Sequence, residues 1–195
     1  MHHFVAEMSQ LDIGSVGGFL QKAQAIYDEN LNAYVKLVLR RPFAKIIVSS
    51  VYSRIFGLRS RPTQEYFEGV ERLLKTTAPT EVSSNGNYSK SALKKVIKEY
   101  DGKDVRKNVD ALFKRVEKHF TEASEKTTSE AVSSSTGIAP GTVMVGVWKA
   151  CEEELLRITE LFAKRISQCY TSTGISLEYT TGDVETAFKR HRVGA

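Results

Sequence analysis

The stretch VWKACEEELLRITELFAKRISQCY, residues 147–170, decides the fold. Its apolar side chains recur every three or four residues, which is the spacing of one face of an α-helix. Pro140 suits the first turn of this helix, because a missing N–H costs nothing there. Trp148, Leu155 and Phe162 lie on the apolar face, and we expect them to anchor the hydrophobic core. An apolar face of this length has to be covered by other helices, so the stretch predicts an all-α helical bundle.

Similar apolar spacing predicts a series of shorter helices in the rest of the chain. In order they cover 16–40, 42–57, 64–74, 90–100, 103–120 and 182–188. Ser89, and Thr180 or Thr181, are the expected N-caps, because their hydroxyls can accept hydrogen bonds from free backbone N–H groups. The polar stretch 121–137 is too poor in apolar residues to pack and is interpreted as a linker. We expect 1–195 to form a single bundle of about five to seven helices, antiparallel between sequence neighbours.

Residues 48–64, VSSVYSRIFGLRSRPTQ, interrupt a pattern that is continuous without them. If they are removed, PFAKII joins EYFEGVERLLKTT, and the apolar residues of both parts fall on one helix face. The extra residues rotate the second part by about 260°, so one straight helix cannot bury both parts. We therefore expect the insertion to break the helix at Gly57 and Pro62, and Thr63 to cap the next helix. The valine and glutamine at its ends have codons that can supply intron boundaries, so a genuine insertion and a retained intron both stay open.

The positive charge of the chain is concentrated in one region. The net charge is +5, and residues 89–120 hold ten Lys or Arg against five Asp or Glu. Lys103, Lys107, Lys114 and Lys118 share one face of the helix predicted there, opposite its apolar face. This face is either a plain solvated surface or a surface for an acidic protein partner or, weakly, acidic phospholipids. No nucleic-acid-binding motif accompanies it, so a nucleic-acid partner is not expected.

The sequence contains no pattern typical of a catalytic, cofactor or metal site. The four histidines are scattered, with His119 expected in the last turn of its helix and His191 in a basic tail. The consecutive Glu152, Glu153 and Glu154 point in different directions on a helix and are interpreted as a solvated face. The predicted apolar faces hold almost no polar groups, so we expect neither an enzyme nor a small-molecule substrate. No apolar run approaches the roughly 18 residues of a membrane-spanning helix, and a cytosolic location is expected.

Several long segments of the chain resemble a known family. They are RRPFAKII, YFEGVERLLKTT, YSKSALKKVIKEYDGKDVRKNVDALFKRVEKHF, VWKACEEELLRITELFAKRISQCY and LEYTTGDVETAF. In order and spacing they are similar to the C-terminal end of the exocyst component Sec-three, in its fungal form, over residues 4–193. None of these segments is a chemical motif.

The resemblance implies the last helical bundle of a rod-like tethering subunit that has no catalytic activity. The exocyst holds secretory vesicles at the plasma membrane before fusion, so the implied partners are other exocyst subunits. The implied location is cytoplasmic, with recruitment to the plasma membrane at sites of polarised secretion. The phosphoinositide- and GTPase-binding module of the family is not carried over to this sequence. The alternative is a peripheral membrane-surface adaptor that binds acidic phospholipids through its lysine-rich helix faces.

Overall fold

The computed structural model describes residues 17–47, 63–130, 140–171 and 173–191. Within these ranges the chain forms seven α-helices and two 3₁₀-helices, with no strand, which confirms the all-α prediction. The elements are α2 (Gly17–Arg40), α3 (Ala44–Ile47), α5 (Thr63–Leu73), η1 (Pro79–Ser84), η2 (Gly86–Tyr88), α6 (Lys90–Ile97), α7 (Gly102–Glu130), α8 (Pro140–Cys169) and α9 (Thr181–Lys189).

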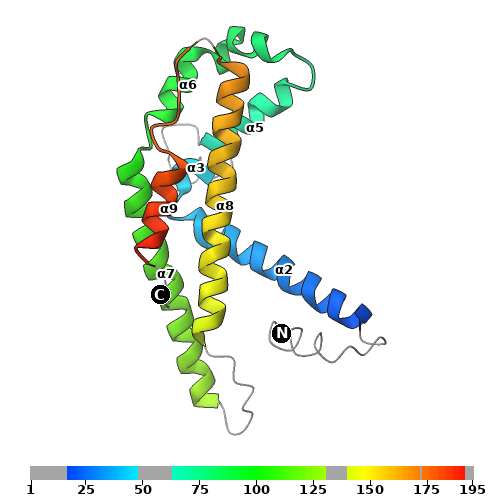
Figure 1. Ribbon diagram of the computed structural model, residues 1–195, viewed down its shortest axis with the longest axis vertical. Coiled ribbons are helices and arrows are strands. Elements are labelled where there is room, and N and C mark those ends of the chain that lie inside the picture. Colours follow the sequence, from blue (N-terminus) through cyan, green and yellow to red (C-terminus); the bar gives the residue numbers. More distant parts are fainter. Residues whose placement is uncertain (1–16, 48–62, 131–139, 172, 192–195) are drawn as a thin grey trace.

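Helix α8 is the central element, and α2, α7, α9 and η1 pack against it (Figure 1). Helix α7 runs antiparallel to the lower part of α8, and α9 packs against both. The C-terminal part of α2 contacts α7 and α8, while its beginning projects away from them. The 3₁₀-helix η1 contacts α8, and α5 and α6 lie at the upper end. The apolar face of α8 therefore meets different neighbours at its two ends.

The core follows the apolar face of α8. Trp148, Leu155 and Phe162 are all buried on it. At the lower end, the ring of Trp148 contacts Phe113 of α7 edge to face, with ring centroids 5.2 Å apart. At the upper end, Phe162 stacks on Phe67 of α5 at 4.7 Å. Such aromatic pairs add to the stabilisation that burial of the rings provides.

Hydrogen-bonded caps fix where three of the helices begin. The Ser89 hydroxyl accepts a hydrogen bond from the Ala92 backbone N–H at 3.3 Å, as its predicted cap role requires. Thr180 forms a capping box with Asp183 at the start of α9, which decides between the two threonines proposed from the sequence. Asp101 plays the same part for α7, because its Oδ1 accepts from the backbone N–H groups of residues 103 and 104. Each cap satisfies N–H groups that have no partner inside the helix.

Helix α7 is longer than its apolar pattern predicts. It continues well past Phe120 to Glu130, so the predicted linker is helical over 121–130. Extending an existing helix costs far less than starting one, and the Glu, Ala and Lys residues of this stretch favour helix. The apolar pattern marks only the part of a helix that packs. The rest of the predicted linker lies outside the described residues.

Not all sequence neighbours are antiparallel. Figure 1 shows α6 leading into α7 in the same general direction, so the expected reversal is wrong at this connection. The connecting residue Tyr100 is buried, and its ring contacts Phe43 at 6.4 Å and Tyr179 at 5.4 Å between centroids. These contacts hold the connection against the core, so a short linker alone does not impose a reversal.

The two helical parts that flank the predicted insertion are separate helices. Helix α3 ends at Ile47, and α5 begins at Thr63 and packs against α3. The apolar stripes of both are buried, including Ile46 in α3 and Val70 in α5. Thr63 is the first helical residue rather than the residue before it, and it too is buried. The expected breaks at Gly57 and Pro62, and the rest of the helix predicted to run to residue 57, lie outside the described residues.

Candidate functional site

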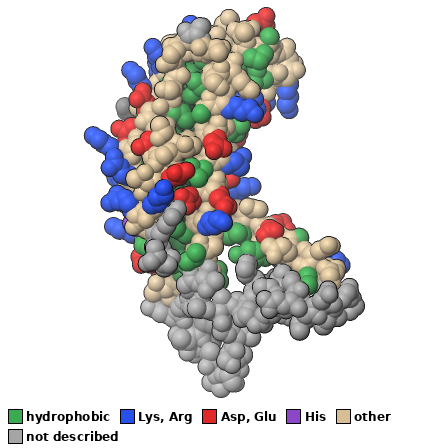
Figure 2. Space-filling view, viewed as in Figure 1, with side chains coloured by type: hydrophobic (Ala, Val, Ile, Leu, Met, Phe, Trp, Pro, Cys, Tyr) green, Lys and Arg blue, Asp and Glu red, His purple; other side chains and the backbone are tan. Residues whose placement is uncertain are grey.

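The four lysines predicted to share a face all lie on α7 with exposed side chains. The structure divides them into two pairs. Lys114 and Lys118 line a hollow beside the helix, whereas Lys103 and Lys107 lie nearer its start and do not line it. Figure 2 shows Lys and Arg side chains gathered along the edge of the molecule that α6 and α7 form. The candidate site is therefore centred on Lys114 and Lys118.

The hollow lies between α7 and the junction of α2 with α3, and its volume is about 690 Å³. We call it the basic hollow. Its ionisable lining residues are Arg41, Lys114, Arg115, Lys118, His119 and Glu122, and its other lining residues are Pro42, Asn108 and Ala111. Four side chains that carry a full positive charge thus face one carboxylate. That carboxylate, on Glu122, lies 3.6 Å from the Lys118 ammonium in an exposed ion pair.

Contacts between α2 and α7 hold the wall of the basic hollow in place. The hydroxyl of Tyr34 in α2 lies 3.1 Å from Nδ1 of His119, within hydrogen-bonding distance. The Tyr34 ring also contacts Phe120 edge to face, at 6.4 Å between centroids. Burial raises the pKa of Tyr34, and the nearby positive charge of Arg115 acts in the opposite direction. Nε of Arg115 is buried without a hydrogen-bond partner in the part of the chain that the structure describes.

Sequence reasoning found half of the positive charge in the basic hollow. Arg115 and His119 follow Lys114 and Lys118 by one residue each, so the repeated four-residue spacing could have marked a second row on α7. Arg41 could not have been found in this way, because it lies in the turn between α2 and α3 and reaches the site only through the tertiary fold. His119 was expected in the last turn of its helix. That expectation is wrong, because α7 continues to Glu130.

A second polar cluster lies where the chain end packs on α7. His191 was expected in a basic tail, but its ring stacks on Phe113 at 4.4 Å between centroids. Its Nε2 lies 2.6 Å from Oδ1 of Asp110, and a guanidinium nitrogen of Arg190 lies 4.0 Å from the other carboxylate oxygen. The hydrogen bond with His191 is the main reason why the pKa of Asp110 is lowered. The turn that follows α9 thus brings Arg190 and His191 over α7, where these contacts fix them.

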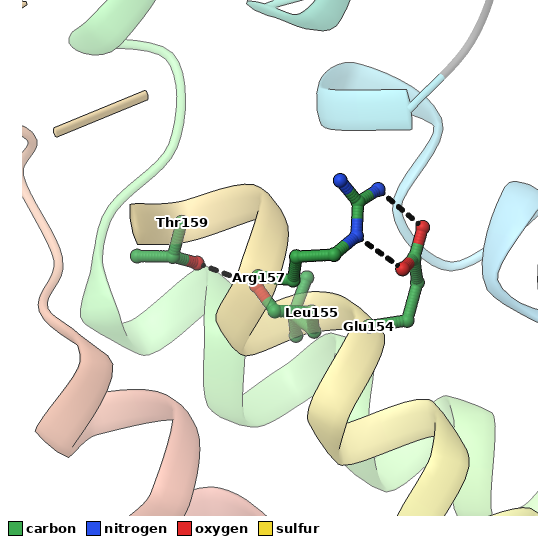
Figure 3. A network of polar contacts seen from close by, with 4 residues as sticks. All are labelled: Glu154, Leu155, Arg157 and Thr159. Carbon is green, nitrogen blue, oxygen red and sulfur yellow. Dashed lines mark hydrogen bonds and ion pairs between the residues drawn. The ribbon is translucent and has the colours of Figure 1, made fainter. Parts of the chain in front are cut away.

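Two of the three consecutive glutamates of α8, Glu153 and Glu154, form local ion pairs. Figure 3 shows Glu154 in a two-point contact with Arg157, at 2.7 and 2.8 Å. It also shows the Thr159 hydroxyl donating to the Leu155 carbonyl oxygen within the same helix. Glu153 lies 3.6 Å from the Lys149 ammonium. In the described ranges there is no group of three or more potential metal-binding side chains and no helix apolar enough to cross a membrane.

The described residues form an all-helical bundle with a charged hollow between α7 and the junction of α2 with α3. Comparison with known proteins identifies the family of the chain. The chain belongs to the family described as Exocyst complex component Sec3, C-terminal, whose family model matches residues 1–172.

Curated relatives agree with this family. The chain is 29% identical over 184 residues to Exocyst complex component 1 of Mus musculus, and this alignment covers 94% of the chain. It is 27% identical over 184 residues to the protein of that name in Drosophila melanogaster, and 21% identical over 191 residues to the one in Dictyostelium discoideum. The chain spans only 17–18% of the length of these relatives. No solved structure matches it significantly.

Proposed function

We propose that the chain is a non-catalytic domain of an exocyst subunit, which helps to tether secretory vesicles to the plasma membrane through protein–protein contacts. The observation that carries this proposal is the family match over residues 1–172. The all-helical fold and the basic hollow are in keeping with a docking role, because they offer a rigid, charged surface.

Finer points of the proposal follow from the resemblance. The other exocyst subunits are the proposed partners, and no cofactor or small-molecule substrate is proposed. The proposed location is cytoplasmic, with recruitment to the plasma membrane at sites of polarised secretion. We further propose that the chain is the fungal form of the subunit, on the basis of the segments quoted above.

A capture experiment tests the docking role. The tagged chain is mixed with each of the other exocyst subunits in turn, and an unrelated helical bundle with the same tag serves as the control. We expect at least one subunit to be retained by the chain and not by the control. Retention of none, with the chain shown to be folded by circular dichroism, would contradict the proposal.

A second candidate function is binding to acidic phospholipids. The exposure of Lys103, Lys107, Lys114 and Lys118 on one helix favours it. Exposed charges are screened over about 8 Å at physiological salt, so such binding should be weak and salt-sensitive. Sedimentation with phosphatidylserine–phosphatidylcholine vesicles tests this, with pure phosphatidylcholine vesicles as the control. Charge reversal at all four lysines should abolish sedimentation, and tight binding that survives high salt would contradict this mode.

A further inference from the structure

We propose that the basic hollow binds a short acidic segment of a partner protein, rich in Asp or Glu and extended along α7. This inference rests on the proposed docking function and makes its partner chemistry specific. It also assigns different roles to the lysines of α7, because only Lys114 and Lys118 belong to the hollow.

Charge complementarity identifies the kind of partner. Arg41, from the turn between α2 and α3, and Lys114, Arg115 and Lys118 of α7 bring positive charge to the lining. Among the described residues that line the hollow, Glu122 is the only carboxylate. Carboxylates are the protein groups that such a surface attracts, and arginine can hold them with two hydrogen bonds at once. Arg115 is half-buried at the wall, so a carboxylate that reaches it is partly shielded from water. Shielding strengthens the attraction, because the effective dielectric constant falls.

The shape of the basic hollow favours a peptide over a membrane. Its lining runs along α7 from Asn108 to Glu122, a length of about 21 Å at 1.5 Å per helical residue. An extended peptide of about six residues spans this distance. A bilayer surface is broad and would meet the protruding lysines, whereas Arg115 and His119 are recessed. A single phosphate group would fill only a small part of the length.

The site is largely formed before any partner binds. The contact of Tyr34 with His119 and the ring contact with Phe120 fix the second half of α2 against α7. Phe43, next to the lining residue Pro42, is fully buried and holds the junction of α2 and α3. A preformed surface loses less conformational entropy on binding, which favours a short linear ligand.

A fluorescein-labelled hexaglutamate peptide is the probe, and its binding is measured by fluorescence anisotropy. The variant Lys114→Glu with Lys118→Glu should bind it about tenfold more weakly, which corresponds to ~1.4 kcal/mol. The matched control is Lys103→Glu with Lys107→Glu, which makes the same charge change on the same helix outside the basic hollow. This control should bind almost as well as the unaltered chain. Because all four side chains are exposed, circular dichroism should show every variant folded.

Arg41→Glu separates binding in the hollow from binding on the face of α7. Arg41 is exposed and lies on the opposite wall, so its reversal should also weaken hexaglutamate binding. If Arg41→Glu has no effect, or if the two lysine pairs weaken binding equally, the basic hollow is not the site. Absence of binding by the unaltered chain at low salt overturns the proposal, as does binding of hexaglutamine with equal affinity. Phosphatidylserine vesicles compete with the peptide only if lipid uses the same site. If the chain binds these vesicles more tightly than hexaglutamate, the proposal of a peptide partner is overturned.

The same variants in the capture experiment distinguish this inference from the proposed function. If the Lys114→Glu, Lys118→Glu variant retains every exocyst subunit that the unaltered chain retains, docking stands and the basic hollow is not its site. A different outcome is that the unaltered chain retains no subunit but binds hexaglutamate in the hollow. That result would contradict the proposed exocyst role and support the proposed acidic-segment site. If the Lys114→Glu, Lys118→Glu variant loses a subunit that the Lys103→Glu, Lys107→Glu control retains, the result supports both the docking function and the basic hollow as its site.

Discussion

The core along α8 and the basic hollow beside α7 are built from the same helices but have opposite chemistry. The core holds Trp148 and Phe162 in ring contacts that exclude water. The hollow is open to solvent and collects charged side chains such as Arg41 and Lys114. Burial of apolar surface stabilises a fold, whereas exposed charges contribute little to stability and much to recognition. Substitutions in the core should therefore lower stability, whereas substitutions in the basic hollow should change binding and leave stability almost unchanged.

The largest effect is expected at Trp148. Trp148→Ala should lower the free energy of unfolding by roughly 3 to 5 kcal/mol, because it removes a buried ring that contacts Phe113 and Phe188. Val145→Ala is the control, since Val145 lies on the same helix with 44% of its surface exposed and should change stability little. Urea denaturation of both variants measures the difference. An unchanged midpoint for Trp148→Ala would refute the role of α8 as the centre of the core.

A smaller effect is expected at Gly69 in α5. Alanine normally stabilises a helix relative to glycine by up to about 1 kcal/mol. A Cβ atom at Gly69 would lie only 2.8 Å from Cζ of Tyr88, and such overpacking typically costs about 1 to 3 kcal/mol. Gly18→Ala is the matched control, because among the described residues no atom beyond the neighbouring residues and the helix's own backbone lies within 4 Å of the Cβ position there. The melting temperature should fall for Gly69→Ala and stay level or rise for Gly18→Ala. A higher melting temperature for both variants would show that Tyr88 can move aside.

The contact between Asp110 and His191 should contribute less still, and only above acidic pH. The folded protein lowers the pKa of Asp110 through its hydrogen bond with His191. This stabilisation is present above the ordinary aspartate pKa of about 3.9 and is lost as the pH falls through the lower folded value. Because the carboxylate is 39% exposed, Asp110→Asn should cost less than about 1 kcal/mol at neutral pH.

Urea denaturation at several pH values checks this expectation. The gap between the unaltered chain and Asp110→Asn should close as the pH is lowered into the acid range. A gap that is constant with pH would mean that packing of His191, rather than the carboxylate charge, holds the chain end.

The smallest change in stability is expected on removal of residues 48–64. The apolar faces of α3 and α5 are both buried, and without the insertion they would lie on one face of a continuous helix. The removal also takes Thr63 and Gln64 from the start of α5 and gives up the packing of α3 against α5, which the joined helix has to offset. The shortened chain should be at least as stable as the full one, as measured by its melting temperature. If it unfolds, these residues belong to the fold. The genomic sequence tests the intron hypothesis separately. This hypothesis is wrong if the gene has no splice boundaries at or near the codons of Val48 and Gln64.

The sequence was sufficient to predict the structure wherever a local pattern has a single structural outcome. The periodic face of α8 and the cap at Ser89 depend only on neighbouring residues, so they were predicted correctly, and the cap of α9 was narrowed to Thr180 or Thr181. The end of α7 was missed because helix propagation needs no apolar signal. Arg41 in the basic hollow was missed for another reason. Arg41 and Lys114 come from different elements, and no spacing rule states which surfaces the fold brings together.

The projecting start of α2 has a consequence for local stability. No residue of its first half, from Gly17 to Asn30, is buried, whereas its second half packs against α7 and α8. The turns before Tyr27, whose hydroxyl lies beside Gly146 of α8, hold no buried residue, so their amide hydrogens should exchange with solvent through brief local opening. Amides in the middle of α8 should exchange only when the whole domain unfolds. Hydrogen exchange along α2 should therefore show a gradient, and the point where protection rises marks the edge of the cooperative unit.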